Sequence, residues 1–147
     1  FKGPGRTALE RGEFLTSIHL PPPPAGAVGV FNKLGRTKVG DISIVSVAVY
    51  SWEDDGRRRW AIALGAVGPT PLRAPEAEAA LAEDTSPEGI RRAAQLAAAA
   101  SRPIDDIRAS AAYRRAMVEV LTRRGVEAIL AGLPSAVGGR PPAGGAA

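Results

Sequence analysis

Cysteine is absent from the 147 residues of the chain, and this excludes several classes of site. Without thiols the chain forms no disulfide, ligates no iron–sulfur cluster and builds no thiolate zinc site. Histidine occurs once, as His19, which excludes multi-histidine metal sites and leaves a serine triad only one possible base. No stretch approaches the roughly 20 consecutive apolar residues that a transmembrane helix requires, so we expect no membrane span.

A starting methionine and a leader segment are also missing. The first residue is Phe1, and no basic-then-apolar segment follows it. We therefore expect a processed chain or a fragment of a longer protein.

Arginine dominates the charge. Lys and Arg outnumber Asp and Glu by 19 to 15, and only Lys2, Lys33 and Lys38 are lysine. Nucleic-acid binding would need a basic stripe with interleaved aromatic residues. Here the arginines fall in scattered groups such as 57–59 and 114–115, which are typical of solvated faces and turns. We expect no nucleic-acid partner.

Strand patterns fill the first half of the chain. Apolar residues alternate, or fill both faces, over residues 14–20, 27–35, 42–52 and 58–67. The 42–52 segment is apolar on both faces, which is typical of a central strand. Asp55-Gly56 between the last two segments predicts a hairpin turn, because both positions accept a positive φ.

Helix patterns fill the second half. Pro75, and Ser86 followed by Pro87, predict two helix starts, and Pro103 ends the second of these helices. A third helix is expected from about Ser110, with Gly125 as an interruption in its apolar stripe. That stripe is predicted to run through Tyr113, Met117, Val118, Val120, Leu121, Ile129 and Leu130.

This order of elements predicts an α+β fold, with an antiparallel β-sheet of three to four strands and three C-terminal helices packed on one face. Strands and helices do not alternate, which argues against a doubly wound nucleotide-binding fold. Residues 134–147 contain mainly Gly, Pro and Ala and are expected to form a disordered tail.

No self-contained active site emerges from the residues. The paired acids Asp54-Asp55 and Asp105-Asp106 lie in a predicted turn and just before a predicted helix, where structural roles are common. The sequence has no phosphate-binding Gly-x-x-x-x-Gly-Lys-Ser/Thr motif. We predict no catalytic residue and no metal ligand.

Four ordered segments nevertheless resemble one family. They occupy residues 12–21, 31–42, 61–74 and 102–114. They read GEFLTSIHLP, FNKLGR with a following Asp-Ile, AIALGAVGPTPLRA, and RPI through DIRASAAYR. Together they resemble the medium, FAD-carrying subunit of molybdenum hydroxylases of the carbon monoxide dehydrogenase and xanthine dehydrogenase type. The resemblance extends over residues 12–130.

The resemblance implies a division of the chain into two parts ahead of the expected tail at 134–147. Residues 1–20 would be the tail end of the flavin-binding domain, and 21–133 a domain like the C-terminal domain of the family. Glycine-rich segments that hold the FAD pyrophosphate belong to the family's N-terminal domain, and nothing like them occurs here. We therefore expect this chain alone not to retain FAD.

The same resemblance implies partners and flavin contacts. Phe14 and Leu15 would lie against the flavin, and the ammonium of Lys33 would approach it. Arg36 and Asp41 would form a loop ion pair that orients the strand of Lys33. The expected partners are the upstream flavin-binding domain, a molybdenum-cofactor large subunit and an Fe–S small subunit, in a cytoplasmic oxidoreductase.

Two other interpretations stay open at this point. One is an interaction module of the same fold that carries no cofactor, which the missing glycine-rich half would favour. The other is a basic nucleic-acid binder, supported only by the net charge of +4. Plain core packing for Phe14 and Leu15, and a surface position for Lys33, are the simplest structural roles for the three residues.

Overall fold

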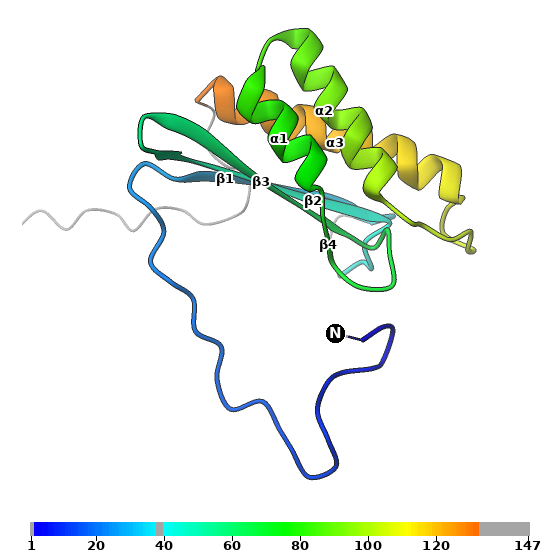
Figure 1. Cartoon of the computed structure of the whole chain (residues 1–147). Helices are drawn as coiled ribbons and strands as arrows, with labels where there is room; N and C mark the ends of the chain where they lie inside the picture. The colour runs from blue at the N-terminus through cyan, green and yellow to red at the C-terminus, as the bar shows by residue number, and fades with distance from the viewer. Residues whose placement is uncertain (1, 38–39, 133–147) are drawn as a thin grey trace, which may run out of the picture.

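One four-stranded antiparallel sheet carries three helices on one of its faces in the computed structural model, which describes residues 2–37 and 40–132 (Figure 1). The strands lie in sequence order, β1-β2-β3-β4. They are β1 (Val28–Leu34), β2 (Val45–Asp54), β3 (Arg57–Gly65) and β4 (Leu72–Arg73). The helices are α1 (Pro75–Glu83), α2 (Pro87–Ala100) and α3 (Ala111–Leu130). The predicted α+β class, with the helices following the sheet, is confirmed.

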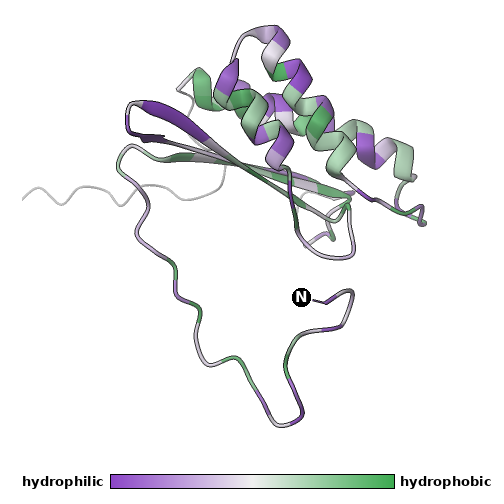
Figure 2. Ribbon diagram, in the orientation of Figure 1, coloured by the Kyte–Doolittle hydropathy of each residue, from purple (hydrophilic) through white to green (hydrophobic). Residues whose placement is uncertain are grey.

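The hairpin between β2 and β3 forms where its turn residues predict it. Asp55 has φ 50° and Gly56 has φ 72°, the left-handed backbone that a tight two-residue turn requires. Its tip is strongly hydrophilic, whereas the strands behind it are hydrophobic (Figure 2). Glu53 and Asp54 form exposed ion pairs there with Arg58 and Arg59, so the tip is a solvated end of the sheet.

One predicted strand is wrong. Residues 14–20 form no regular structure, and every residue from 4 to 26 is exposed. An alternating segment becomes a strand only when a neighbour supplies backbone hydrogen bonds, and the register pairs residues 14–20 with no strand of the described chain. This N-terminal segment instead runs away from the body, on the side of the sheet opposite the helices (Figure 1). The fourth strand is β4, which lies outside the four predicted strand segments.

The helices α2 and α3 start where the sequence predicts them. The Oγ of Ser86 accepts a hydrogen bond from the Gly89 amide at 3.2 Å, and the Oγ of Ser110 accepts one from the Tyr113 amide at 3.2 Å. These bonds satisfy amides that have no partner within the first helical turn. Pro75 and Pro87 each occupy the beginning of a helix, as predicted.

The apolar stripe of α3 differs from the predicted one. Tyr113 is exposed, whereas Arg114 is buried beside Val118 and Leu121 on the inner face. Gly125 does not interrupt the helix: a Cβ there would lie 2.7 Å from Cγ2 of Val49 on β2. The glycine therefore lets α3 approach the sheet closely, a packing role that outweighs its low helix propensity.

Alternate residues of the strands build the core with the helices. Helix α1 packs on β3, helix α3 packs on β1 and β2, and α2 packs on both helices. Paired across the sheet, Val30, Val49 and Ile62 form one row of the covered face, and Val47 and Leu64 belong to the next. The Asn32 side chain donates to the Leu121 carbonyl at 3.1 Å, which fixes this face as the helical one.

The edge beside the short β4 is closed by α1. The carboxylate of Glu78 accepts a hydrogen bond from the Ile62 amide at 2.8 Å and ion pairs with Arg73 at 2.7 Å. The Ala74 amide donates to the Ile62 carbonyl at 3.1 Å. Both backbone groups of Ile62 on this edge are thus satisfied, which removes a site of strand addition.

Candidate functional site

The face of the sheet opposite the helices is apolar and carries no cover in the described chain. Along β2 the residues that alternate with the buried positions are Ser46, Ala48, Tyr50 and Trp52, and all four are only half-buried. Phe31 on β1 is 44% exposed. We call this surface the open face; with Gly29, Lys33, Ala61, Ala63 and Gly65, these residues make it up.

Aromatic rings and small residues alternate across the open face. The Tyr50 and Trp52 rings lie with their centroids 5.6 Å apart. Gly29 lies opposite Tyr50, and a Cβ there would be only 3.2 Å from the Tyr50 ring. Ala48, Ala61 and Ala63 leave shallow space between the rings. Such a surface can accept a flat or closely packed partner, because little side-chain volume stands between that partner and the backbone.

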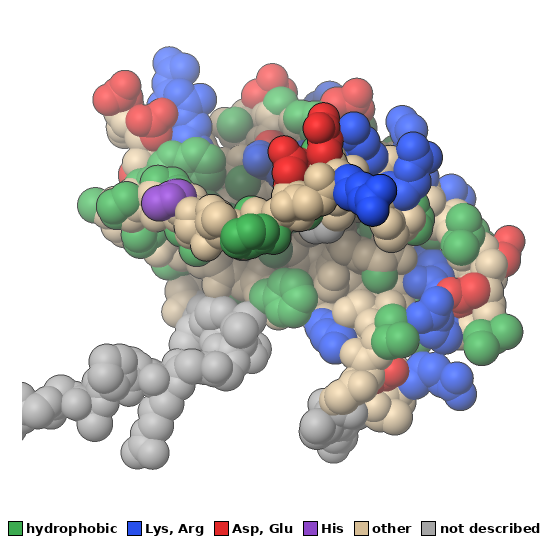
Figure 3. Space-filling model, turned by 90° about the horizontal axis from the view of Figure 1, so that it is seen from below, with side chains coloured by type: hydrophobic (Ala, Val, Ile, Leu, Met, Phe, Trp, Pro, Cys, Tyr) green, Lys and Arg blue, Asp and Glu red, His purple; other side chains and the backbone are tan. Residues whose placement is uncertain are grey.

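Figure 3 views the molecule from the side of the open face. Hydrophobic side chains and the single histidine are visible there, and Lys and Arg gather toward the right of the view. The N-terminal segment passes along this side without packing on it, since residues 4–26 are all exposed.

Lys33 lies at one end of the open face, opposite Ser46 of β2. Its Nζ donates to the backbone carbonyl of Asp41 at 2.6 Å. An ammonium has three N–H donors, so this bond holds the side chain while leaving two donors for a partner. The predicted surface position of Lys33 and its place on a strand are both seen in the structure.

The loop beside Lys33 is closed differently from the prediction. Among the described residues, Arg36 forms no ion pair with Asp41; the carboxylate instead accepts the backbone amides of Arg36 and Thr37, the latter at 2.8 Å. The Thr37 amide is the main cause that lowers the pKa of Asp41 below its usual value. Gly35 is needed here, because a Cβ would lie 2.7 Å from the Asp41 carboxylate.

The other two predicted flavin contacts lie in the N-terminal segment. Phe14 is 77% exposed and Leu15 67% exposed, so neither packs into a core. The simple core-packing role is therefore wrong for both. The structure does not bring them against Lys33, and as exposed apolar side chains they are free to contact another part of a larger protein.

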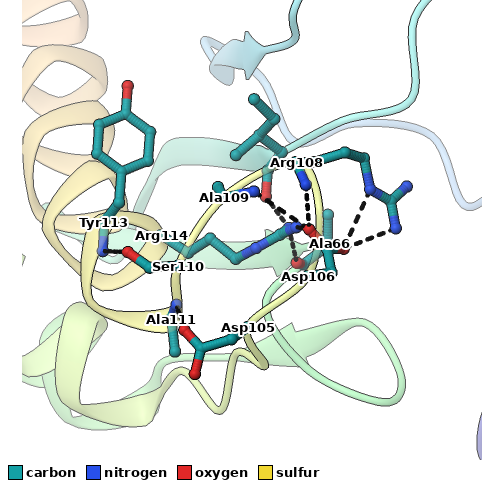
Figure 4. Close-up of polar contacts among 10 residues, drawn as sticks. Ala66, Asp105, Asp106, Arg108, Ala109, Ser110, Ala111, Tyr113 and Arg114 are labelled. Carbon is teal, nitrogen blue, oxygen red and sulfur yellow. Dashed lines mark hydrogen bonds and ion pairs between the residues drawn. The ribbon is translucent and has the colours of Figure 1, made fainter.

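A buried polar network lies at the start of α3, and the sequence analysis missed it (Figure 4). Arg114 is 3% exposed; its guanidinium donates to the Ile44 carbonyl at 2.6 Å, the Ala66 carbonyl at 3.2 Å and the Asp106 carboxylate at 2.7 Å. The expectation of a solvated Arg114-Arg115 pair is thus wrong for Arg114. Its position four residues after Ser110 and four before Val118, on the apolar side of a helix, was the available signal.

Asp106 is the acidic centre of this network. Its carboxylate accepts the side chain and the backbone amide of Arg108, the Arg114 side chain and the Ala109 amide. The charged hydrogen bond from Arg108, followed by the backbone bonds and Arg114, holds the pKa of Asp106 far below its usual range. Asp105 accepts the Ala111 amide at 2.6 Å. Both acids therefore organise the entry to α3, in line with the predicted structural role.

Residues 2–37 and 40–132 contain no cluster of His, Asp and Glu able to hold a metal ion. Within the same ranges, no helix is both long and apolar enough to cross a bilayer.

Known proteins with similar sequences are medium or FAD-binding subunits. The carbon monoxide dehydrogenase medium chain of Afipia carboxidovorans is 38% identical over 129 residues, covering 86% of this chain and 44% of its own. The nicotine 6-hydroxylase medium subunit of Paenarthrobacter nicotinovorans is 36% identical, covering 84% and 44%. The xanthine dehydrogenase FAD-binding subunit of Escherichia coli O157:H7 is 28% identical, covering 83% and 43%.

Solved structures agree with the sequences. Carbon monoxide dehydrogenase from Hydrogenophaga pseudoflava superposes with a TM-score of 0.81 at 36% identity, covering 89% of this chain and 46% of that one. Quinoline 2-oxidoreductase from Pseudomonas putida 86 gives 0.78 at 30% identity, covering 89% and 46%. The chain thus spans less than half the length of the relatives it matches. The model of the CO dehydrogenase flavoprotein C-terminal domain matches residues 30–129, and the chain belongs to this family.

Proposed function

We propose that this chain forms the C-terminal part of the FAD-carrying, electron-transfer subunit of a molybdenum hydroxylase, where it completes the flavin site and a subunit interface. The observation that carries the proposal is the open face, an apolar sheet surface uncovered in a chain whose relatives are more than twice as long. Exposed apolar surfaces of this kind mark contacts with a partner. The upstream flavin-binding domain is the partner that would cover it.

Exposed residues of the N-terminal segment and of β1 fit a supporting role in a flavin site. Phe14 and Leu15 offer exposed apolar side chains that can pack against a ring system. Lys33 offers a held ammonium with unused donors. When bound, FAD supplies electron transfer, and the protein tunes that chemistry by placing charges near the ring. A cation favours the reduced flavin, which carries more negative charge at its pyrimidine edge.

The proposal also assigns the other components of the enzyme. With no cysteine and one histidine, this chain provides no iron–sulfur cluster and no multi-histidine centre. The clusters would belong to a small subunit, and the substrate would be oxidised at a molybdenum cofactor in a large subunit. Electrons would then pass through the clusters to FAD. We place the complete enzyme in the cytoplasm.

The test of this function compares two charge-removing variants in the complete subunit. Lys33→Met keeps most of the side-chain volume and removes the ammonium. The midpoint potential of the flavin is expected to fall by the equivalent of about 1 kcal/mol, as for a partly solvated charge pair. Arg92→Met, on the exposed side of α2, is the matched control and should leave the potential unchanged.

Two results would count against the proposal. A full-length protein that takes up no FAD after incubation and desalting would remove the flavin function altogether. Equal potentials for the parent and both variants would reduce Lys33 to a surface lysine, leaving Phe14 and Leu15 as the only flavin contacts to test.

A further inference from the structure

A pocket of about 520 Å³ lies at the end of the sheet where β2 begins and β3 ends. Three segments far apart in the sequence line it: Ile42 and Ser43 before β2, three residues after β3 (Ala66, Gly68 and Pro69), and five residues from Arg102 to Arg108 before α3. Pro4 of the N-terminal segment touches its rim. Phe14, Leu15 and Lys33 are not among the lining residues, so the pocket is separate from the proposed flavin contacts.

Hydrogen bonds between the lining segments hold the walls of this pocket in place without a ligand. The Arg102 amide donates to the Val67 carbonyl at 2.7 Å and joins two of the three lining segments. Arg114 joins the same turn to the start of β2 through the Ala66 and Ile44 carbonyls. Pro69 and Pro103 stiffen the walls, since proline fixes φ. A ligand would therefore lose little free energy in ordering the site.

The charge of the pocket is unbalanced. Arg102, Arg108 and Arg114 line it, together with a single acid, Asp106. Asp106 pairs with both Arg108 and Arg114 at 2.7 Å, and the Nε–H of Arg114 finds no acceptor among the described residues. No hydrogen-bond or ion-pair partner is found for the Arg102 guanidinium within residues 2–37 and 40–132. Two positive charges remain uncompensated, one of them fully available at Arg102.

We propose that this pocket binds a small organic anion, a carboxylate or phosphate group carried on an apolar body. The anionic group would accept hydrogen bonds from Arg102, whose planar guanidinium matches both chemistries. The apolar body would cover Ile42 and Ile104, which are 66% and 72% exposed in the free protein. The volume lies within the range of about 300–1,000 Å³ that small-molecule sites occupy. The proposal stands without the flavin assignment.

Titration calorimetry on the full-length protein tests it with four probes. They are 2-naphthoate, 2-naphthyl phosphate, inorganic phosphate and the neutral 2-naphthylmethanol. At least one naphthyl anion should bind about tenfold or more tightly than both inorganic phosphate and the neutral alcohol, because charge and apolar contact act together. Comparing the two naphthyl anions tells a carboxylate site from a phosphate site.

Variants then locate the binding. Arg102→Gln should weaken the preferred anion about tenfold, the loss of one charge-assisted hydrogen bond, whereas Arg102→Lys should retain part of the affinity. Arg92→Gln on α2 should change nothing. Equal affinity for the alcohol, no effect of Arg102→Gln, a loss in Arg92→Gln, or no binding by either naphthyl anion would each overturn the proposal. Failure to bind because another polypeptide seals the pocket in the full-length protein would overturn it as well.

Discussion

The two faces of the sheet share their strands but not their surroundings. Along β2, Val45, Val47 and Val49 are fully buried under the helices, whereas Ala48 and Tyr50, which alternate with them, remain half-exposed. The sequence is apolar on both sides, so composition alone does not separate them. The difference teaches that this chain stabilises itself through one face, while the other face has no cover among the described residues.

The largest expected effect comes from comparing one residue on each face. Ile62→Ala on the covered face should lower the free energy of unfolding by about 2–5 kcal/mol, because it opens a cavity in a packed core. Phe31→Thr on the open face should change it by less than about 1 kcal/mol, since the ring is already partly solvated and threonine keeps strand propensity. Urea unfolding of both variants measures the contrast.

The variant on the open face should act on assembly instead. Phe31→Thr should weaken association with the remainder of the subunit, measured by adding the chain to the separately expressed flavin-binding domain. If Phe31→Thr were as destabilising to the isolated chain as Ile62→Ala, the open face would be part of the folding core and the contrast between the faces would be wrong.

A second contrast concerns adjacent arginines on α3. Arg114→Met should destabilise the protein by about 3 kcal/mol, because it leaves the Ile44 and Ala66 carbonyls without the buried guanidinium and removes one charged partner of Asp106. Arg115→Met, at an exposed position, should stay within about 0.5 kcal/mol of the parent. Thermal and urea unfolding both report the difference, and similar values for the two variants would contradict the structural role of Arg114.

Close approach of α3 to the covered face gives a smaller effect. Gly125→Ala gains about 1 kcal/mol of helix propensity but must displace Val49, an overpacking cost of about 1–3 kcal/mol. We expect a net loss of about 1 kcal/mol in urea unfolding. The exposed neighbour Arg124→Ala is the control. A stabilised Gly125→Ala would show that α3 can move away from the sheet without cost.

Acid should weaken the Asp106 network at the entry to α3, and the expected change in the free energy of unfolding is the smallest of these effects. The pKa of Asp106 is lowered in the folded state, so its stabilising contribution is present above the unfolded value of about 3.9 and is lost as the pH falls toward the folded one. Asp106→Asn should therefore lose less stability than the parent between pH 5 and pH 3. Parallel curves of unfolding free energy against pH for the two proteins would argue against it.

Local signals in the sequence were enough to predict most of the fold. The Asp55-Gly56 turn, the Ser86 and Ser110 caps and the two helix-starting prolines act within a few residues, so their pattern is readable without knowing the partners. Residues 14–20 show the limit. Their alternation is genuine, but a strand needs a neighbour, and the described chain offers none.

The candidate site was harder to predict for the same reason. Lys33 was placed correctly on a strand and at the surface. Its hydrogen bond to the Asp41 carbonyl joins residues eight positions apart, and no local sequence pattern predicts such a contact. Arg114 was expected in solvent because its bonding partners lie 70, 48 and 8 residues away. The flavin roles of Phe14, Leu15 and Lys33 stay predictions. The expected tail at 134–147 lies outside the described residues, and the domain boundaries stay predictions as well.

The order of the elements along the chain has a consequence for how the protein is made. The sheet is complete at β4, but α3, which covers β1 and β2, begins 57 residues after the end of β2. At the usual translation rate of about 5–20 residues per second, about 3–11 s pass between the end of synthesis of β2 and the start of synthesis of α3. During that interval both apolar faces of the strand are exposed, so the nascent chain is a natural client for chaperones until α3 emerges.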